Sequence, residues 1–374
     1  MNARPLEGLT VLDFSTLLPG PMATLLLAEA GAEVLKVERP GRGEEMRSYQ
    51  PRWGGHAVNF ALLNRGKKSL AIDLKDPDAR AKLQPLLERA DVVVEQFRPG
   101  VMERLGLDYE SLRRINSRII YCSITGYGQS GPKRDQAGHD LNYVGDAGLL
   151  ALSMGKPANP VLPPALVADI GGGAYPAVMN ILLALQSRQR SGEGCRLDVS
   201  MADNLFTFMY WAIGNGLGAG EWPGNGNDLV TGGTPRYRLY ATRDERIVAA
   251  CPLEEKFWDA FCRIIQLDPE LRNDSRDVEA TGRKVAEIIA SRDAAEWQKR
   301  FAAEDCCCTV VATLQEALED PHFNARGLFA HRLAGDGDVN LPALPMPISQ
   351  SFRADPGTPL AAPHLGADNE DMLG

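Results

Sequence analysis

The sequence predicts an α/β protein with a large Rossmann-like parallel-sheet domain and a smaller α/β domain. Short apolar segments rich in β-branched residues alternate with helical segments between residues 8 and 201. Such alternation is typical of a parallel sheet with helices on both faces. Around residues 204–232 the sequence becomes rich in aromatic residues and glycine, which is typical of a connector between domains. The length of 374 residues is sufficient for two domains.

The first elements predict one β-α-β unit. Residues 8–15, GLTVLDFS, are apolar and β-branched, which indicates a buried strand. A helix should follow, with Pro21 in its first turn and Gly31 at its end, because proline suits helix starts and glycine suits helix ends. Residues 32–38, AEVLKVE, then predict a second strand.

The same pattern recurs along the chain. Helices are predicted over 76–90 and 108–116, and a long helix should begin after the glycines at 171–173 and end near Gly192. The strands that alternate with them are predicted at 91–97, 118–125 and 195–201.

These patterns give four segments. They are a large Rossmann-like domain at 1–203, a connector at 204–232, a small α/β domain at 233–330 and a C-terminal strap at 331–374. The small domain should contain two strands about a polar turn within 235–251, followed by helices near 254–266, 278–291 and 294–304. The strap is rich in proline and glycine and is expected to return to the large domain.

Composition excludes several classes of partner. A net charge of −9 argues against a nucleic-acid binder and against binding to anionic membranes. The N-terminal sequence lacks the pattern of a secretory signal, and the apolar stretch ATLLLAEAGAEVL is too short and too acidic to span a bilayer. A cytoplasmic protein without membrane attachment is therefore expected. The seven cysteines, with Cys306, Cys307 and Cys308 consecutive, predict free core thiols without a metal site, and the triplet has no assigned role.

The segment GYGQSG at 126–131 matches the glycine pattern of dinucleotide-binding loops. Such a site needs a helix that starts within the loop and points its N-terminus at the pyrophosphate. Here the loop continues into PKRDQAGHD, which contains Pro132 and has no apolar period. The sequence therefore does not favour NAD(P), and the glycines are better explained by close approach of backbone to another ligand.

Several ordered blocks resemble one family. They are LEGLTVLDFSTLLPGPMATLLLAEAGAEVLKVERPG, LNRGKKSLAIDLK, ADVVVEQFRPGVMERLGLDYESL and ITGYGQSGP. Together they are similar to the family III CoA-transferase (CaiB/BaiF) group over about residues 5–330. Within that group GHDLNY, LVADIGGG and GGTPRYRLYATRDE most resemble the α-methylacyl-CoA racemases.

The resemblance implies an interlocked homodimer of chains with a Rossmann-like domain that binds no NAD. It also implies an acyl-CoA thioester as substrate, with coenzyme A as part of that substrate and no prosthetic group.

The implied reaction removes and returns the hydrogen at C2 of a 2-methylacyl-CoA through an enolate. Bases are then needed on both faces of the carbon. His139 and Asp169 are the candidates, with Asp140 as a supporting partner and Glu254, rather than Glu255, as a hydrogen-bond partner of the histidine. The alternatives are a capping or core histidine, and an N-cap role for Asp169. Close approach of ligand is expected to explain the glycines after Asp169.

Coenzyme A carries phosphates, which call for arginine and lysine. The family's CoA-contacting blocks place a set of candidate binding residues after the predicted strands. They are Arg39, Asn64, Lys68, Gln96, Arg98, Arg104, Gly126 and Tyr127.

Two other functions stay open. In transferases of the family the aspartate attacks the thioester, so Asp169 would be a nucleophile that forms an acyl-enzyme anhydride. Against this, the chain keeps His139 and has only TGGT at 231–234, where formyl-CoA transferases carry four glycines. The other alternative is a catalytically idle CoA-binding protein.

Overall fold

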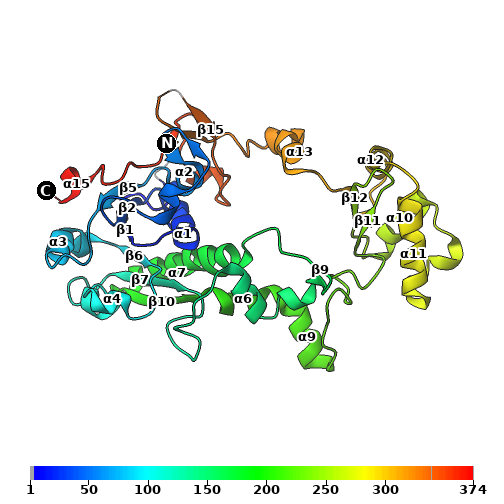
Figure 1. Ribbon diagram of the computed structural model, residues 1–374, viewed down its shortest axis with the longest axis horizontal. Coiled ribbons are helices and arrows are strands. Elements are labelled where there is room, and N and C mark those ends of the chain that lie inside the picture. The colour runs from blue at the N-terminus through cyan, green and yellow to red at the C-terminus, as the bar shows by residue number, and fades with distance from the viewer. Residues whose placement is uncertain (1–3, 338, 374) are drawn as a thin grey trace. The chain divides into compact units, whose positions relative to one another are not determined.

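The structure, a computed structural model, describes residues 4–337 and 339–373 (Figure 1). It divides into two compact units. The first contains the described residues of Met1–Ala147, Pro164–Phe208 and Asn324–Gly374, and the second contains Gly148–Pro163 and Met209–Phe323. Residues 148–163, which the sequence analysis placed in the large domain, thus group with the smaller unit.

The first unit is built on a sheet of six parallel strands in the order β10-β7-β6-β1-β2-β5. The strands are β1 (Thr10–Asp13), β2 (Glu33–Glu38), β5 (Lys68–Ala71), β6 (Val92–Glu95), β7 (Ile120–Thr125) and β10 (Cys195–Ser200). Leu12 of β1 pairs with Leu35 on one side and with Val93 on the other. This is the strand order of a doubly wound fold, and the direction of winding changes between β1 and β6. The parallel sheet confirms the predicted fold class.

Helices connect these strands. They are α1 (Pro19–Glu29), α2 (Val58–Asn64), α3 (Ala79–Arg89), α4 (Val101–Arg104), α5 (Tyr109–Arg113), α6 (Asp140–Asp146), α7 (Tyr175–Ser191) and α8 (Met201–Asn204). Helix α7 ends at Gly192, whose φ of 76° is the left-handed conformation that glycine adopts without strain. The predicted helix ends near Gly31 and Gly192 are both confirmed.

A helical stretch over Ala168–Ser191 has the length and hydropathy of a membrane span. Within the first unit it packs as a core helix, because Ala177, Ile181 and Ala184 are buried. It contacts α1, β7 and β10. Its other face exposes Met179 and Leu183.

The second unit contains a three-stranded antiparallel sheet, β11-β12-β13, with helices beside it. Its core includes the buried Trp258, Phe261 and Trp297. The elements are β8 (Gly155–Lys156), β9 (Asn159–Pro160), α9 (Tyr210–Ala219), β11 (Arg238–Ala241), β12 (Ile247–Ala250), α10 (Glu255–Ile265), α11 (Val278–Ile289), α12 (Ala294–Ala302), β13 (Cys308–Val310) and α13 (Leu314–Glu319). Helix α14 (Pro321–Ala325) follows. The predicted hairpin and three helices are present, and β13 was not predicted.

The cysteines are all unpaired, as expected. Cys122, Cys262 and Cys306 are buried, but Cys307 is exposed. The prediction of core thiols is therefore wrong for Cys307, since it lies on a turn with a positive φ of 51° just before β13.

The C-terminal tail packs on the first unit. It forms β14 (Arg332–Ala334), β15 (Asn340–Pro342), β16 (Leu360–Ala361) and α15 (Asn369–Leu373). The Arg353 guanidinium pairs with Glu29 of α1 at 2.8 Å, and the Asn369 side chain accepts a hydrogen bond from the Ala71 amide at 2.8 Å. These contacts tie the tail to α1 and to the edge strand β5.

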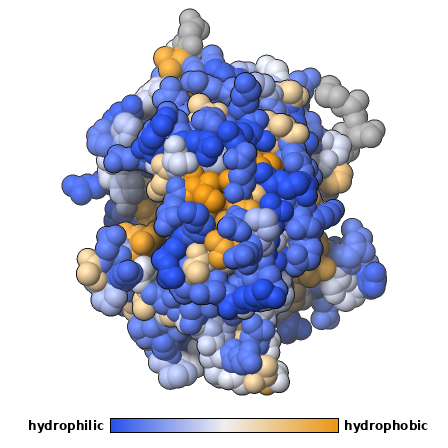
Figure 2. All heavy atoms as spheres, turned by 90° about the vertical axis from the view of Figure 1, so that its right-hand side faces the viewer, coloured by the Kyte–Doolittle hydropathy of each residue, from blue (hydrophilic) through white to orange (hydrophobic). Residues whose placement is uncertain are grey.

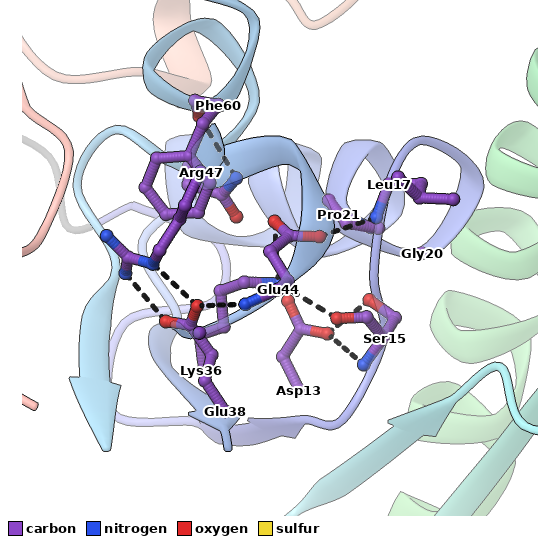
Figure 3. A network of polar contacts seen from close by, with 12 residues as sticks. Asp13, Ser15, Leu17, Gly20, Pro21, Lys36, Glu38, Glu44, Arg47 and Phe60 are labelled. Carbon is purple, nitrogen blue, oxygen red and sulfur yellow. Dashed lines mark hydrogen bonds and ion pairs between the residues drawn. The ribbon is translucent and has the colours of Figure 1, made fainter. Parts of the chain in front are cut away.

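A buried ionic network closes the carboxyl end of β1 (Figure 3). The Asp13 carboxylate lies 3.2 Å from the Lys67 ammonium, and the Lys36 ammonium lies 3.4 Å from Glu44. Burial alone would raise the pKa of Asp13, but the two lysines hold that pKa at about 2. The Glu44 carboxylate in turn accepts a hydrogen bond of 2.6 Å from the backbone amide of Leu17. The network thereby holds the loop after β1, where Leu17 has a positive φ of 62°.

Candidate active site

A pocket of about 510 Å³ lies in the first unit at the carboxyl ends of the strands. Its walls come from the loops after β1, β6 and β7, which supply Thr16 and Leu17, Gln96 to Pro99, and Gly126 and Tyr127. In open parallel sheets, ligands bind at this edge where the direction of winding changes. Six of the predicted site residues line it: Gln96, Arg98, Gly126, Tyr127, His139 and Asp169.

His139 stands immediately before α6, in the N-cap position. Its backbone N–H donates to the Asn142 side chain at 3.0 Å. The imidazole is solvent-exposed and lines the pocket, so it is not a core histidine, whereas the N-cap position is the one that the capping alternative predicts. An imidazole that reaches a pocket can act as a general acid or a general base.

Asp169 lies in a π-helical turn, Ala168–Ala174, that leads into α7. The N-cap of this turn is Val167, so Asp169 does not have the N-cap role that the alternative interpretation gave it. Burial raises the pKa of the Asp169 carboxyl to about 6, the Asp140 carboxylate contributes to the rise, and His139 opposes it. The two candidate bases therefore interact electrostatically across one pocket. Single π-helical turns are often found at functional sites.

Asp140 is buried and links the two candidate bases in an unexpected way. Its carboxylate accepts the backbone N–H of Asp169 at 2.9 Å, so Asp140 positions Asp169. The amide of Ile170 is also occupied, because it donates to the Leu166 carbonyl. These two amides are therefore not available to an enolate oxygen.

The raised pKa of Asp169 predicts a pH-dependent stability. The folded state binds this proton more tightly than the unfolded state, so the free energy of unfolding should fall as pH rises from about 4 to about 6. Asparagine carries no charge at any of these pH values. Asp169→Asn should therefore be more stable than the parent by about 1–3 kcal/mol at pH 7.5, and equally stable near pH 4. Denaturant unfolding at the two pH values tests this, and a variant less stable at pH 7.5 would contradict it.

The three glycines after Asp169 have a different cause from the one expected. A Cβ on Gly172 would lie 2.3 Å from the Met201 carbonyl oxygen, and a Cβ on Gly171 would lie 2.7 Å from the Phe208 ring. A Cβ on Gly173 would lie 3.0 Å from the Met201 side chain. The close approach is thus to α8 and its neighbours, and the expectation that a ligand explains these glycines is wrong.

Gly172→Ala should destabilise the first unit by about 1–3 kcal/mol, because the new methyl group would clash with the backbone carbonyl of Met201. That carbonyl cannot shift without moving the backbone around it. Gly145→Ala is the matched control, since Gly145 lies in α6 with nothing within 4 Å of a Cβ. Alanine is the better helix former, so the control should be unchanged or up to about 1 kcal/mol more stable. Denaturant midpoints of both variants measure this, and equal midpoints would contradict the packing explanation.

Tyr143 is a pocket residue that the sequence analysis did not identify. A Cβ on Gly126 would lie 2.4 Å from its ring, and its hydroxyl donates to the Gly138 carbonyl. Tyr127 meets the same ring edge-on at 5.2 Å between centroids. Gly126 is therefore needed for the tyrosine to pack here. The first helix after this loop begins at Asp140, which confirms that the loop lacks the dinucleotide-binding geometry.

Gln96 and Arg98 follow β6. The Gln96 side chain accepts a hydrogen bond of 2.9 Å from the backbone amide of Gly20, at the start of α1. This bond joins two walls of the pocket. Arg98 is exposed, and the other arginine in the lining is Arg134, which was not predicted. Arg134 belongs to the segment PKRDQ, directly after the glycine-rich loop. This position is the feature of the sequence from which its place in the pocket could have been predicted.

Four other predicted binding residues lie outside this pocket. Asn64 is buried, and its side-chain oxygen accepts a hydrogen bond of 2.9 Å from the Lys67 ammonium. Lys68 opens β5 and pairs with Glu33 at 2.7 Å, so it lies at the amino edge of the parallel sheet, opposite the pocket. Arg39 donates to the Gly43 carbonyl at 2.8 Å, and Arg104 is exposed on α4.

Glu254 belongs to the second unit, where it precedes α10 and is exposed. Neighbouring Glu255 pairs with Arg236 at 2.8 Å. Among the residues that the structure describes, no hydrogen bond or ion pair holds the Glu254 side chain. This favours Glu254 over Glu255 as the available carboxylate, and its pairing with His139 stays a prediction.

Comparison with known proteins shows the family. Human α-methylacyl-CoA racemase is 35% identical over 98% of this chain and 92% of that protein. The acetyl-CoA:oxalate CoA-transferase of Acetobacter aceti is 32% identical over 92% of this chain and 89% of that protein. A CaiB/BaiF family protein of Brucella suis has a solved structure that matches with a TM-score of 0.82, at 27% identity and 100% coverage of both chains.

The sequence profile of CoA-transferase family III matches residues 6–369. The glycine-rich loop, the histidine before α6 and the aspartate of the π-helical turn all lie within this match. On this basis the chain belongs to the CoA-transferase family III, the group that includes the CaiB/BaiF proteins.

Proposed function

We propose that the protein is a CoA-thioester racemase that inverts C2 of 2-methylacyl-CoA by 1,1-proton transfer. The observation that carries this proposal is that the side chains of His139 and Asp169 line one pocket, in which burial raises the pKa of Asp169 to about 6. Two groups able to exchange protons near neutral pH are what a two-faced transfer needs. The similarity to mammalian α-methylacyl-CoA racemases supports the same reaction.

In this mechanism one group removes the C2 hydrogen and the other returns a proton to the opposite face. The pKa of Asp169, about 6, brings the carboxyl close to the range in which it can act as base and as acid. The negative charge that develops moves to the thioester oxygen as the enolate forms. Asp140 keeps the Asp169 backbone in place, and Tyr143 packs against Gly126 in the wall of the same pocket.

Coenzyme A enters as part of the substrate, and the proton transfers themselves call for no prosthetic group. Arg98 and Arg134 are the cationic side chains that line the pocket. Both are exposed, and guanidinium groups bind phosphate oxygens in a bidentate manner. We assign them to the phosphates of CoA, in place of Lys68 and Asn64.

The reaction is tested by incubating one epimer of a 2-methylacyl-CoA with the protein in deuterated water. A racemase should introduce deuterium at C2 and form both epimers without any acceptor acid. NMR follows the label, and chiral chromatography follows the epimers. If CoA changes partner only when a second carboxylic acid is present, and no label enters without it, the racemase proposal is overturned.

CoA transfer between carboxylic acids is the second candidate. It is favoured by relatives such as the succinate–glutarate CoA-transferase of Agrobacterium fabrum, which is 32% identical over 99% of this chain. In that reaction the Asp169 carboxylate would attack the thioester carbon, displace CoA as the thiolate and form an anhydride. Hydroxylamine trapping of the acyl group on Asp169 would identify it. If the protein binds acyl-CoA but catalyses neither racemisation nor CoA transfer, it is a catalytically idle CoA-binding protein.

We also propose that the protein is a homodimer. An apolar groove of about 840 Å³ in the first unit lies along α1 and α7. Its lining includes the exposed Tyr175, Met179, Leu182, Leu183 and Phe352. Figure 2 shows a further face, where apolar side chains form a patch within a mainly hydrophilic surface. Apolar patches of this kind mark sites of association, and light scattering of the purified chain tests for the dimer.

A further inference from the structure

Three side chains with metal-binding atoms meet on the first unit, outside the pocket described above. They are His56, Asp336 and His364, and their ligand atoms all lie within 4.8 Å of one another. The His364 Nε2 atom is 3.1 Å from an Asp336 carboxylate oxygen. The rings of His56 and His364 lie next to each other in a tilted arrangement, with 4.7 Å between centroids and 30° between planes.

The backbone around the cluster is held by contacts between distant segments. His56 lies in β4 (His56–Ala57), which pairs with β3 (Arg52–Trp53) in a short hairpin. The Asp336 amide donates to the Gly54 carbonyl at 3.2 Å. A Cβ on Gly55 would lie 1.9 Å from the Asp336 carboxylate, so only glycine leaves room for that carboxylate.

His364 comes from the last part of the tail. Just before it, the Pro363 carbonyl accepts a hydrogen bond from Arg47 at 3.1 Å. Just after it, the Gly366 amide donates to the Ser69 hydroxyl at 3.1 Å. The three side chains therefore join the N-terminal hairpin to two separate points of the C-terminal tail.

The charges around the cluster permit a cation. The charge of Arg47 is balanced, because its guanidinium forms two contacts of 2.6 Å with the Glu38 carboxylate. Arg52 donates to the carbonyls of Arg47 and Gly55.

We propose that His56, Asp336 and His364 bind a divalent transition-metal ion, with zinc as the best match, and that the ion fastens the tail to the first unit. Two imidazoles and one carboxylate suit zinc, whereas magnesium and calcium prefer oxygen ligands. Tetrahedral zinc at about 2.0–2.2 Å from each ligand needs closer ligand atoms than those seen. The exposed side chains of Asp336 and His364 can move to close that gap.

The test uses the untagged full chain after treatment with a chelator. Competition with a chromophoric chelator should show one zinc ion bound per chain. His364→Gln and Asp336→Asn should each weaken binding about tenfold or more, because each removes a ligand. His322→Gln is the matched control, since His322 is an exposed histidine on α14, and it should bind as the parent does.

Two further measurements separate this site from the cysteines. Cobalt substituted for zinc should show no thiolate charge-transfer band, and Cys307→Ser should bind as tightly as the parent. Zinc should also slow proteolysis within the tail of the parent and not in His364→Gln. The proposal is overturned if the parent binds no stoichiometric zinc, if both ligand variants bind it as tightly as the parent, or if Cys307→Ser loses it.

Discussion

Asp169→Asn should lower the rate of racemisation by about 10²–10⁴-fold, the usual contribution of one general acid–base group. Asparagine has nearly the same shape as aspartate but cannot take up a proton. The Asp169 carboxylate forms no hydrogen bond with another described residue. The substitution by asparagine therefore leaves no hydrogen-bond partner unsatisfied. Turnover of each epimer, followed by chiral chromatography at saturating substrate, measures the effect.

Two controls make this result specific. The variant should bind the acyl-CoA within a few-fold of the parent, and at pH 7.5 it should be at least as stable, as argued from the raised pKa of Asp169. A variant that is folded, binds substrate and keeps more than about a tenth of the parent's rate would show that Asp169 does not transfer the proton.

His139→Gln should produce a loss of the same order in racemisation, about 10²–10⁴-fold. The side chain is exposed, so the substitution should change the free energy of unfolding by less than about 0.5 kcal/mol. His322→Gln, which removes an exposed histidine of the second unit, is the matched control and should keep the full rate. Steady-state rates and thermal unfolding of both variants are the measurements required.

A near-normal rate in His139→Gln would assign the second proton transfer to another group. The other titratable side chains that line the pocket with Asp169 are Arg98, Arg134, Tyr127 and Tyr143. Burial raises the pKa of Tyr127 to about 12. Burial raises the pKa of Tyr143, and the charge on Asp169 adds to that rise, so the phenol is a poor base near neutral pH. This leaves His139 as the better candidate.

The sheet of the first unit could be predicted in large part from the sequence, because its strands are short apolar runs between helical segments. The exception is β5, which is four residues long and begins with Lys68. Nothing local marks these residues as a strand. They form a strand because the backbone of β2 has unpaired hydrogen-bonding groups along that edge of the sheet. In the resulting pairing, Leu35 lies opposite Lys68.

The site was predicted unevenly for a related reason. His139 and Asp169 lie in distinctive local sequence, and the structure brings both to one pocket. Asn64 and Lys68 also lie in a distinctive segment, but Asn64 serves the buried Lys67 and Lys68 faces the other edge of the sheet. Contacts over long sequence separations, such as that of Lys67 with Asp13, cannot be read from local patterns.

The glycines after Asp169 carry the same lesson. Three consecutive glycines indicate a close approach, and the sequence does not say to what. The structure shows that Gly172 lies against the Met201 carbonyl. A ligand-facing role was inferred from their position next to a candidate base, whereas the actual neighbour is a helix that begins nearly thirty residues later, at Met201.

The most direct test of the two-base mechanism follows C2 deuterium exchange of each pure epimer, by NMR, with His139→Gln and Asp169→Asn separately. If the two groups serve opposite faces, each variant should exchange only the epimer whose hydrogen points to the base that it retains, and the two variants should prefer opposite epimers. If both variants exchange the same epimer, or either one still exchanges both at equal rates, His139 and Asp169 do not act from opposite faces of the carbon.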